Sequence, residues 1–268
     1  SNHRGTLSYT PILSLRPEGE KSPLFCIHPA GGSATVFAHL ADELKKDRPV
    51  FGIQARGLEG SEKPFTSFDE MIDAYVLAIM ELVPQGELNF VGYSAGGVIA
   101  HHLACVFSER GRQIGGVALM DSVLPSGISD QVVQSREALL RSMAKEYGWK
   151  ETKGVGTEDL LEMVLLHLIE QRQVPVGTPV QWVDRMISEI ILSGERLISH
   201  DVVKGNFDTV YFLAEAEKTD DEITGKRLIW NHYCRSVQYV PIQTLHNRML
   251  EADPSKAIAK VLDVFFEK

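Results

Sequence analysis

The sequence predicts an α/β protein built around a mostly parallel, doubly wound sheet. Between residues 24 and 120, short apolar runs that suit buried parallel strands alternate with segments whose apolar residues recur at helical spacing. The chain has 268 residues, of which 44% are hydrophobic, so it is long enough to bury a sizeable core. A third observation is the pentapeptide Gly92-Tyr93-Ser94-Ala95-Gly96, which joins one of these apolar runs to a helical segment.

The first elements predicted are an edge strand and two parallel strands. Residues 10–15 suit an edge strand, because Pro17 interrupts the run soon after it. Residues 24–27 and 49–53 are apolar runs typical of buried strands. A helix that begins at Ser33 and carries apolar residues on one face is expected between them.

The next elements surround the pentapeptide. A capping-box pattern that opens at Ser67 predicts the start of a helix. Residues 88–91 suit the strand before the pentapeptide, and the helix after it is expected to end at Gly111. Residues 114–120 form another buried strand, which delivers Asp121 at its carboxyl end.

Residues 125–205 contain no strand pattern. Three helical stretches are expected there, near 130–147, near 158–171 and from Thr178 onward, where a capping-box pattern places Pro179 at the first helical position. We interpret the segment as a helical lid inserted between two strands of one sheet. A separate helical domain is the alternative.

The strand pattern resumes after this segment, which favours a single domain over residues 1–268 with its core at about 9–124 and 206–268. The later elements expected are a strand, a helix, a last strand and a final amphipathic helix, at about 209–213, 222–234, 237–243 and from Asp253-Pro254 onward.

Composition excludes several kinds of partner. A net charge of −9 argues against nucleic acid, and no run approaches the roughly eighteen apolar residues of a membrane span. Three widely spaced cysteines, Cys26, Cys105 and Cys234, favour reduced thiols in the cytoplasm over disulfides. No Cys/His spacing resembles a metal site, so we expect no metal, no bound cofactor, no nucleic acid and no membrane contact. The polar N-terminus has no secretory segment and suggests a boundary within a longer protein.

Ser94 is the predicted nucleophile. A serine on a sharp turn between a strand and a helix is held in a strained conformation that exposes Oγ above the sheet edge. Gly92 and Gly96 remove the Cβ atoms that would collide in this turn. The Ala95 N–H, at the start of the helix, could stabilise an oxyanion. A glycine-rich turn around a buried structural serine is the alternative interpretation.

A nucleophilic serine needs a base, and the base needs an orienting acid. In the fold with this turn the chain order is serine, acid, histidine. His246 follows the last predicted strand and is the expected base, whereas the other histidines precede or adjoin the serine or lie in helical stretches. Chain order alone allows two locations for the acid, Asp121 or the pair Asp220 and Asp221. The charged loop around that pair favours a solvated role for it.

A second oxyanion donor is expected in the loop after residues 24–27. Ala30 is the preferred residue, with Gly31 next, because Pro29 has no N–H to donate. The small residues in this loop would let the backbone approach a substrate carbonyl.

The chain resembles the thioesterase domain that ends nonribosomal peptide synthetases and related polyketide synthases. The segments that carry the resemblance are Pro23-Leu24-Phe25-Cys26-Ile27-His28-Pro29-Ala30-Gly31-Gly32, Gly92-Tyr93-Ser94-Ala95-Gly96-Gly97, Leu119-Met120-Asp121-Ser122 and Leu245-His246. The resemblance implies an α/β-hydrolase fold, Asp121 as the acid, and the Ala30 and Ala95 amides as the oxyanion hole.

The resemblance also implies a reaction at the end of an assembly line. An upstream carrier domain of the same synthase would present an acyl or peptidyl chain as a phosphopantetheine thioester. Ser94 would form an acyl-enzyme, and water or a nucleophile within the chain would release an acid or a ring. The alternatives are a stand-alone editing thioesterase, a small-molecule carboxylesterase, and a hydrolase-fold binding protein without catalysis.

Overall fold

Seven strands form one sheet in the computed structural model, which describes residues 9–127, 135–216 and 218–267. Their order across the sheet is β1-β3-β2-β4-β5-β6-β7. β1 pairs with β3 in antiparallel fashion and the other neighbours are parallel, so the predicted mostly parallel sheet is confirmed. The strands are β1 (Ile12–Arg16), β2 (Leu24–Ile27), β3 (Val50–Ile53), β4 (Leu88–Tyr93), β5 (Ile114–Met120), β6 (Asp208–Ala214) and β7 (Ser236–Ile242).

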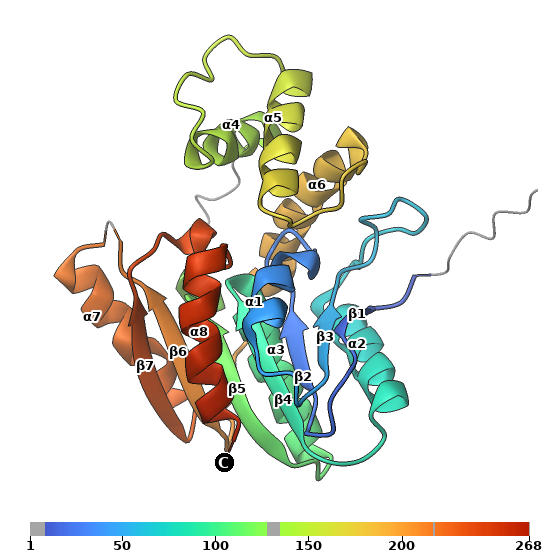
Figure 1. Ribbon diagram of the computed structural model, residues 1–268, viewed down its shortest axis with the longest axis vertical. Helices are drawn as coiled ribbons and strands as arrows, with labels where there is room; N and C mark the ends of the chain where they lie inside the picture. Colours follow the sequence, from blue (N-terminus) through green and yellow to red (C-terminus); the bar gives the residue numbers. More distant parts are fainter. Residues whose placement is uncertain (1–8, 128–134, 217, 268) are drawn as a thin grey trace, which may run out of the picture.

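Helices cover both faces of this sheet (Figure 1). α1 and α8 pack on one face, while α2 and α3 pack on the other. The longer helices are α1 (Ala38–Glu43), α2 (Phe68–Leu82), α3 (Ala95–Glu109), α4 (Arg136–Glu146), α5 (Thr157–Glu170), α6 (Val180–Ile198), α7 (Asp220–Ile229) and α8 (Ala252–Phe265). No helix in the three described ranges is long and apolar enough to cross a membrane.

The continuous apolar run in β2 follows from this double covering. Successive side chains of a strand point to opposite faces of its sheet. Phe25 and Ile27 therefore join the core beneath α2 and α3, and Leu24 and Cys26 join the core beneath α1 and α8. All four are fully buried, as expected of a central strand with helices on both sides.

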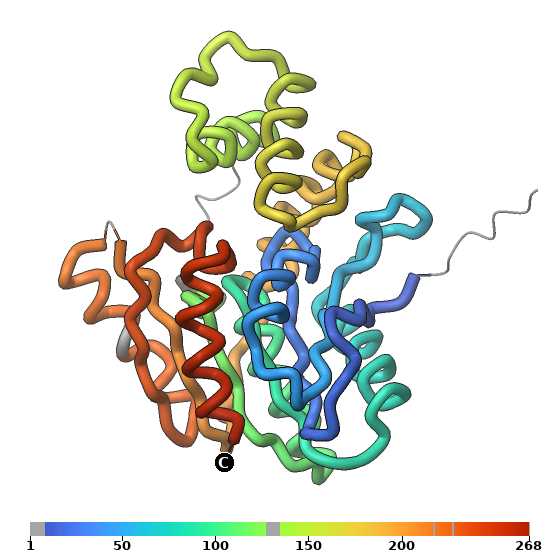
Figure 2. The backbone as a smooth tube through the Cα atoms, viewed as in Figure 1, coloured from blue at the N-terminus to red at the C-terminus, as the bar shows by residue number. Residues whose placement is uncertain are grey.

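The helices α4, α5 and α6 lie in the chain between β5 and β6 and pack on one another around their own apolar cluster. Leu160, Val164 and Val183 are fully buried in it. In Figure 2 the three helices stand together above the body that contains the sheet. Their role as an inserted lid stays a prediction, and the first residues of the stretch expected from 130 lie outside the described residues.

The predicted start of the third helix of this segment, α6, is wrong in detail. α6 begins at Val180 with Pro179 as its N-cap, and no side chain caps it. Thr178 instead donates its hydroxyl to the Pro175 carbonyl at 2.8 Å. The hydroxyl is thereby used in the preceding turn, so the capping box that the spacing predicted does not form.

Other helices begin a few residues away from the predicted positions. The helix expected at Ser33 is a 3-10 turn over Thr35–Phe37 that continues into α1. Ser33 Oγ is hydrogen-bonded to Thr35 Oγ1 at 2.7 Å, within the loop that precedes the turn. α8 begins at Ala252, with Glu251 as its N-cap, so Asp253 lies in its first turn.

A buried ion pair ties α6 to the body that contains the sheet. Arg196 and Glu189 pair within α6, and their side chains are only 4% and 3% exposed. Arg196 also donates to the Phe65 carbonyl at 3.0 Å. Burial raises the pKa of Glu189, although the Arg196 guanidinium opposes this change. The bond from Arg196 to Phe65 links α6 to the segment that leads into α2.

Replacing Arg196 by methionine should lower the free energy of unfolding by about 3–5 kcal/mol at pH 7, because it leaves a buried carboxylate without its partner. Urea denaturation followed by circular dichroism measures the loss. The loss should shrink at pH 4, where Glu189 takes up a proton more readily. The double variant with Glu189→Gln, which removes the charge, should recover much of the stability. An equally stable single variant at pH 7 would contradict this account.

Candidate active site

Ser94 lies on the turn between β4 and α3, with backbone angles φ of 56° and ψ of −123°. A positive φ is costly for a residue with a side chain, so the surrounding structure must impose it. A Cβ on Gly92 would lie 2.2 Å from the Gly96 carbonyl oxygen, and one on Gly96 would lie 2.3 Å from the His28 carbonyl oxygen. These contacts require glycine on both sides of the serine.

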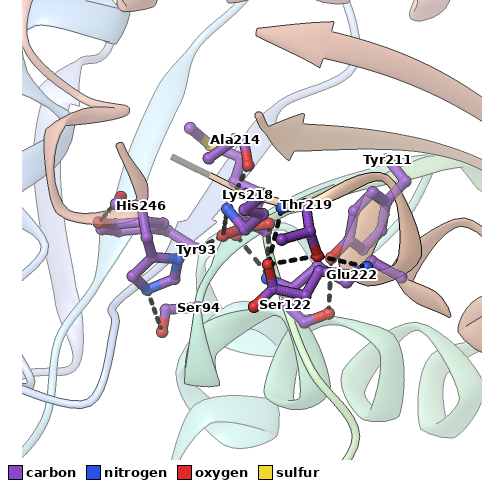
Figure 3. A network of polar contacts seen from close by, with 12 residues as sticks. Tyr93, Ser94, Ser122, Tyr211, Ala214, Lys218, Thr219, Glu222 and His246 are labelled. Carbon is purple, nitrogen blue, oxygen red and sulfur yellow. Dashed lines mark hydrogen bonds and ion pairs between the residues drawn. The ribbon is translucent and has the colours of Figure 1, made fainter. Parts of the chain in front are cut away.

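Ser94, His246 and Asp121 form a continuous hydrogen-bonded array. Figure 3 shows His246 and Ser94 facing each other. His246 Nε2 is 3.0 Å from Ser94 Oγ, and its Nδ1 is 2.7 Å from Asp121 Oδ2. His246 begins a 3-10 turn after β7, and the Tyr93 hydroxyl donates to its carbonyl at 2.5 Å. The structure therefore brings together three side chains that are far apart in the sequence.

Asp121 follows β5 directly and also has a positive φ, of 46°. Its N–H donates to the Phe212 carbonyl of β6 at 2.8 Å. The carboxylate is fully buried. Burial would raise its pKa, but hydrogen bonds and charge from His246 and Lys226 outweigh this and lower the pKa to about 2. The group is thus a carboxylate at any pH near neutrality.

Asp220 and Asp221 occupy a different environment from Asp121. Both are exposed in the first turn of α7. Thr219 and Glu222 form a complete capping box at the start of this helix. Two carboxylates at a helix N-terminus complement the helix dipole. The structure brings Asp121, the first of the two locations that chain order allowed, to the imidazole.

Two lysines beside Asp121 were not anticipated from the sequence. Lys218 Nζ lies 3.3 Å from Asp121 Oδ2, and Lys226 Nζ lies 2.9 Å from Asp121 Oδ1. The loop that carries Lys218 was expected to be solvated, yet this side chain is only 15% exposed. Their position in the sequence could have indicated this contact. Both lysines follow β6, and β6 pairs with β5, the strand that directly precedes Asp121. Glu217 of this loop lies outside the described residues.

The two predicted oxyanion donors lie near Ser94. Ala95 is the first residue of α3, where an N–H has no partner within the helix. Ala30 lines the same cavity as Ser94 and His246. In the described parts of the chain, the Ala30 N–H donates no hydrogen bond to the protein. Both amides are therefore available to a ligand.

His28 supports the loop that contains Ala30. Its ring is buried, with Nε2 2.7 Å from the Tyr75 hydroxyl and Nδ1 2.7 Å from the Pro29 carbonyl. Burial lowers its pKa to about 4, so the ring is neutral near neutral pH. Because Tyr75 belongs to α2 in the core, the loop is attached to a rigid element.

A cavity of about 180 Å³ opens onto Ser94 and His246. Its wall comes from the loop after β2, from the segments that carry Ser94 and His246, and from the α4–α6 segment. The side chains supplied by the three helices and the turn before α6 are mainly apolar or aromatic: Met143, Tyr147, Leu168, Gln173, Val174, Trp182, Met186 and Ile190. Among the described residues that line the cavity there is no Asp, Glu, Lys or Arg side chain.

The site contains no arrangement suited to a metal ion. Across the described residues, no group of three or more His, Cys, Asp or Glu side chains is placed to hold one. The polar groups around Ser94 instead match the requirements of acyl transfer, which are a nucleophile, a base with an orienting acid, and free backbone donors.

The sheet order, the serine on its strained turn and the helices on both faces define an α/β-hydrolase fold. Comparison with protein families gives a more specific assignment. The family described as "Thioesterase domain" matches residues 22–179, more than half of the chain. The chain belongs to this thioesterase family.

Curated relatives with similar segments are large synthetases. The chain is 32% identical over 158 residues to "Malpinin synthetase" from Mortierella alpina, a match that covers 59% of this chain and 2% of that protein. It is 42% identical over 110 residues to "Nonribosomal peptide synthetase btyA" from Aspergillus terreus, covering 41% and 12% of the two chains. The chain thus spans a small part of the length of the relatives it matches.

Solved structures show the same fold along nearly the whole chain. A four-domain nonribosomal peptide synthetase, AB3403, superposes with a TM-score of 0.78 at 19% identity, covering 97% of this chain and 20% of that one. The Vlm2 thioesterase domain superposes with a TM-score of 0.74 at 22% identity, covering 94% and 96%. At these identities the likeness establishes the fold.

Proposed function

We propose that this domain releases an acyl or peptidyl chain from the phosphopantetheine thioester of a carrier domain. Ser94 is the nucleophile, His246 the base, Asp121 the orienting acid, and the Ala30 and Ala95 amides the oxyanion donors. The observation that carries the proposal is the hydrogen-bonded array from Asp121 through His246 to Ser94 at the mouth of the apolar cavity. Membership of the thioesterase family supports a thioester as the substrate.

Acylation begins when Ser94 Oγ attacks the thioester carbonyl and transfers its proton to His246 Nε2. The carbonyl oxygen becomes an oxyanion that accepts hydrogen bonds from the Ala30 and Ala95 N–H groups. The tetrahedral intermediate then collapses, the carbon–sulfur bond breaks, and the imidazolium returns its proton to the departing thiol. The buried Asp121 carboxylate keeps Nδ1 protonated throughout, so that Nε2 is the free base.

Deacylation repeats these proton transfers with a new nucleophile. His246 removes a proton from water, or from a hydroxyl or amine within the acyl chain, and the nucleophile attacks the Ser94 ester. Collapse of the second intermediate returns the proton to Ser94 Oγ. Water releases a carboxylic acid, whereas an internal nucleophile releases a ring. Both outcomes use the same residues.

The cavity supports an apolar, uncharged acyl group next to the thioester. Methionine, tryptophan and aliphatic side chains make up most of the wall, and no Asp, Glu, Lys or Arg among the described lining residues could pair with a carboxylate or ammonium. Moving an unpaired charge into such an environment is costly. The carrier domain is proposed to lie upstream in the same polypeptide, as the greater length of the synthetase relatives suggests. The thioesters would then be processed in the cytoplasm.

Intact-protein mass spectrometry tests the proposal. A carrier domain is loaded with octanoyl-phosphopantetheine or, as a matched charged control, with 7-carboxyheptanoyl-phosphopantetheine. Addition of the enzyme should return the octanoyl carrier to its unloaded mass, with an octanoyl adduct on the enzyme at early times. The carboxylated chain should be released more slowly, by about tenfold or more, because its charge must enter the cavity.

Other outcomes of this experiment identify other functions. Rapid cleavage of small oxoesters with a carrier that remains loaded would indicate a carboxylesterase. Release of short acyl groups from many unrelated carriers would indicate a stand-alone editing thioesterase. Binding of the loaded carrier without any mass change on either protein would indicate a hydrolase-fold protein without catalysis.

A further inference from the structure

The Asp121 carboxylate faces three nitrogen atoms of described residues. Oδ2 accepts a hydrogen bond from His246 Nδ1 at 2.7 Å and lies 3.3 Å from Lys218 Nζ, while Oδ1 lies 2.9 Å from Lys226 Nζ. The side chains of Lys218 and Lys226 are 15% and 21% exposed, and the carboxylate is fully buried. The acyl-transfer mechanism given above uses neither lysine.

Other contacts fix the position of these charges. Lys218 also donates to the Ala214 carbonyl at the end of β6. Lys226 stands on α7, whose start is fixed by the capping box of Thr219 and Glu222 (Figure 3). The lysines are therefore held by a strand end and by a capped helix. They differ in this respect from exposed ion pairs, whose long side chains must be ordered at a cost in entropy.

The turn that presents the carboxylate is fixed as well. The Ser122 carbonyl accepts hydrogen bonds from the Tyr211 hydroxyl at 2.9 Å and from Trp230 Nε1 at 3.0 Å. Both donors are buried side chains of the core. They brace the residue that follows Asp121 and so help to hold Asp121 in its positive-φ conformation.

We propose that Lys218 and Lys226 are positioning residues that limit how strongly Asp121 attracts a proton to His246. Two ammonium charges face one carboxylate, so the group of three carries a net charge of +1. The negative potential at the imidazole is weaker than an isolated carboxylate would produce. His246 consequently stays neutral, and able to accept the Ser94 proton, to lower pH than it would beside Asp121 alone.

The other titratable groups near this pair do not remove the effect of the lysines. The Tyr93 ring lies beside the His246 ring at a tilt of 34°, and Tyr211 lies near Asp121. Burial raises the pKa of both hydroxyls, so both remain neutral. Charged groups of the described residues on the adjoining elements include Glu146 of α4, bonded to Asn247, and Glu251, paired with Arg248. They also include Asp220, Asp221 and Glu222 in the first turn of α7. Each of these is present unchanged in the variants compared below.

The test is the pH dependence of Ser94 modification by a small fluorophosphonate, which reports activation of the serine without requiring a natural substrate. The acid limb of the rate profile is the range in which the rate falls as the pH is lowered. Lys226→Met should move this limb to higher pH by about one pH unit, the size expected when one charge near a protein surface is removed. Lys226→Arg keeps the charge and should retain the original limb. Lys260→Met removes the same charge from an exposed position on α8 and should also leave the limb in place.

A second readout follows the histidine directly. Proton NMR titration of the His246 ring, assigned with a His246→Gln variant, should show the same upward shift in Lys226→Met. Lys218→Met should act in the same direction, but it also removes the bond to Ala214, so Lys226 is the decisive position. A lower rate with an unmoved acid limb, or an equal shift in Lys226→Arg, would overturn the proposal.

This inference can fail separately from the proposed function. It depends on that function only for the roles of Ser94, His246 and Asp121, and neither readout uses a carrier or a thioester. A shift in the fluorophosphonate profile without release from the carrier would support the role of the lysines and contradict the proposed substrate. Release from the carrier with no shift in the fluorophosphonate profile would support the proposed substrate and contradict the role of the lysines.

Discussion

Ser94→Ala is expected to reduce the rate of acyl release by about a factor of 10⁶, as found for other serine enzymes that lost the nucleophile. The hydroxyl lies 3.0 Å from His246 Nε2 on a turn whose backbone is too closely packed for a Cβ on Gly92 or Gly96. Among the described residues, no other hydroxyl is hydrogen-bonded to His246 Nε2. The residual activity would come from the oxyanion donors and from binding alone.

Release of the octanoyl carrier, followed by mass spectrometry, measures this loss. Ser108→Ala serves as the matched control, because it removes an exposed hydroxyl near the end of the same helix and should leave the rate unchanged. The Ser94→Ala protein should keep the melting temperature of the wild type to within a few degrees. An octanoyl adduct on this variant, or an unchanged rate, would refute the assignment of Ser94.

Asp121→Asn is expected to reduce acyl release by about 10⁴, the loss seen when an amide replaces the acid of such an array. The amide can donate to His246 Nδ1, which favours the tautomer with a proton on Nε2 and removes the free base. The substitution also leaves the ammonium groups of Lys218 and Lys226 facing a neutral group in a largely buried site. Their charge then further opposes formation of the imidazolium.

The matched controls are Asp220→Asn and Asp221→Asn, which remove the same charge at the exposed first turn of α7. Each should change the rate by only a small factor. If either control were as damaging as Asp121→Asn, a different acid would have to orient His246. Comparison of melting temperatures separates a loss of fold from a loss of chemistry.

Asp121 also makes stability depend on pH. Its pKa in the folded protein, about 2, lies below the ordinary value of 3.8. The stabilisation is therefore complete above the ordinary value and is lost as the pH falls toward 2. Asp121→Asn lacks this contribution, so its unfolding free energy should change less than that of the wild type across this interval.

Local sequence patterns were sufficient for most elements of the fold. The apolar run in β2 and the strand that ends at Asp121 are predictable because a strand buried on both faces needs apolar side chains throughout. The start of α6 was mispredicted because Thr178 can bond either to its own helix or to the preceding turn, and only the path of the chain decides between them.

For the site, chain order and the strand-turn-helix pattern singled out Ser94 and His246, but left two locations for the acid. The choice depends on which strand lies beside β4 and on which loop reaches the imidazole. Pairing of parallel strands is a contact between distant segments, and spacing along the chain does not encode it. The structure brings Asp121 within 2.7 Å of His246 Nδ1.

The sequence by itself determined the α/β class, the sharp turn at Ser94 and the position of His246 after the last strand. These depend on local requirements, such as glycine where a Cβ would collide and apolar residues where a strand is covered on both sides. Contacts between distant segments place Lys218 and Lys226 against Asp121 and make α4, α5 and α6 part of the apolar wall of the cavity. The physical reason is that burial of a charge is governed by its neighbours in space. The residues next to a lysine in an acidic stretch of sequence do not predict which carboxylate it contacts in the folded protein.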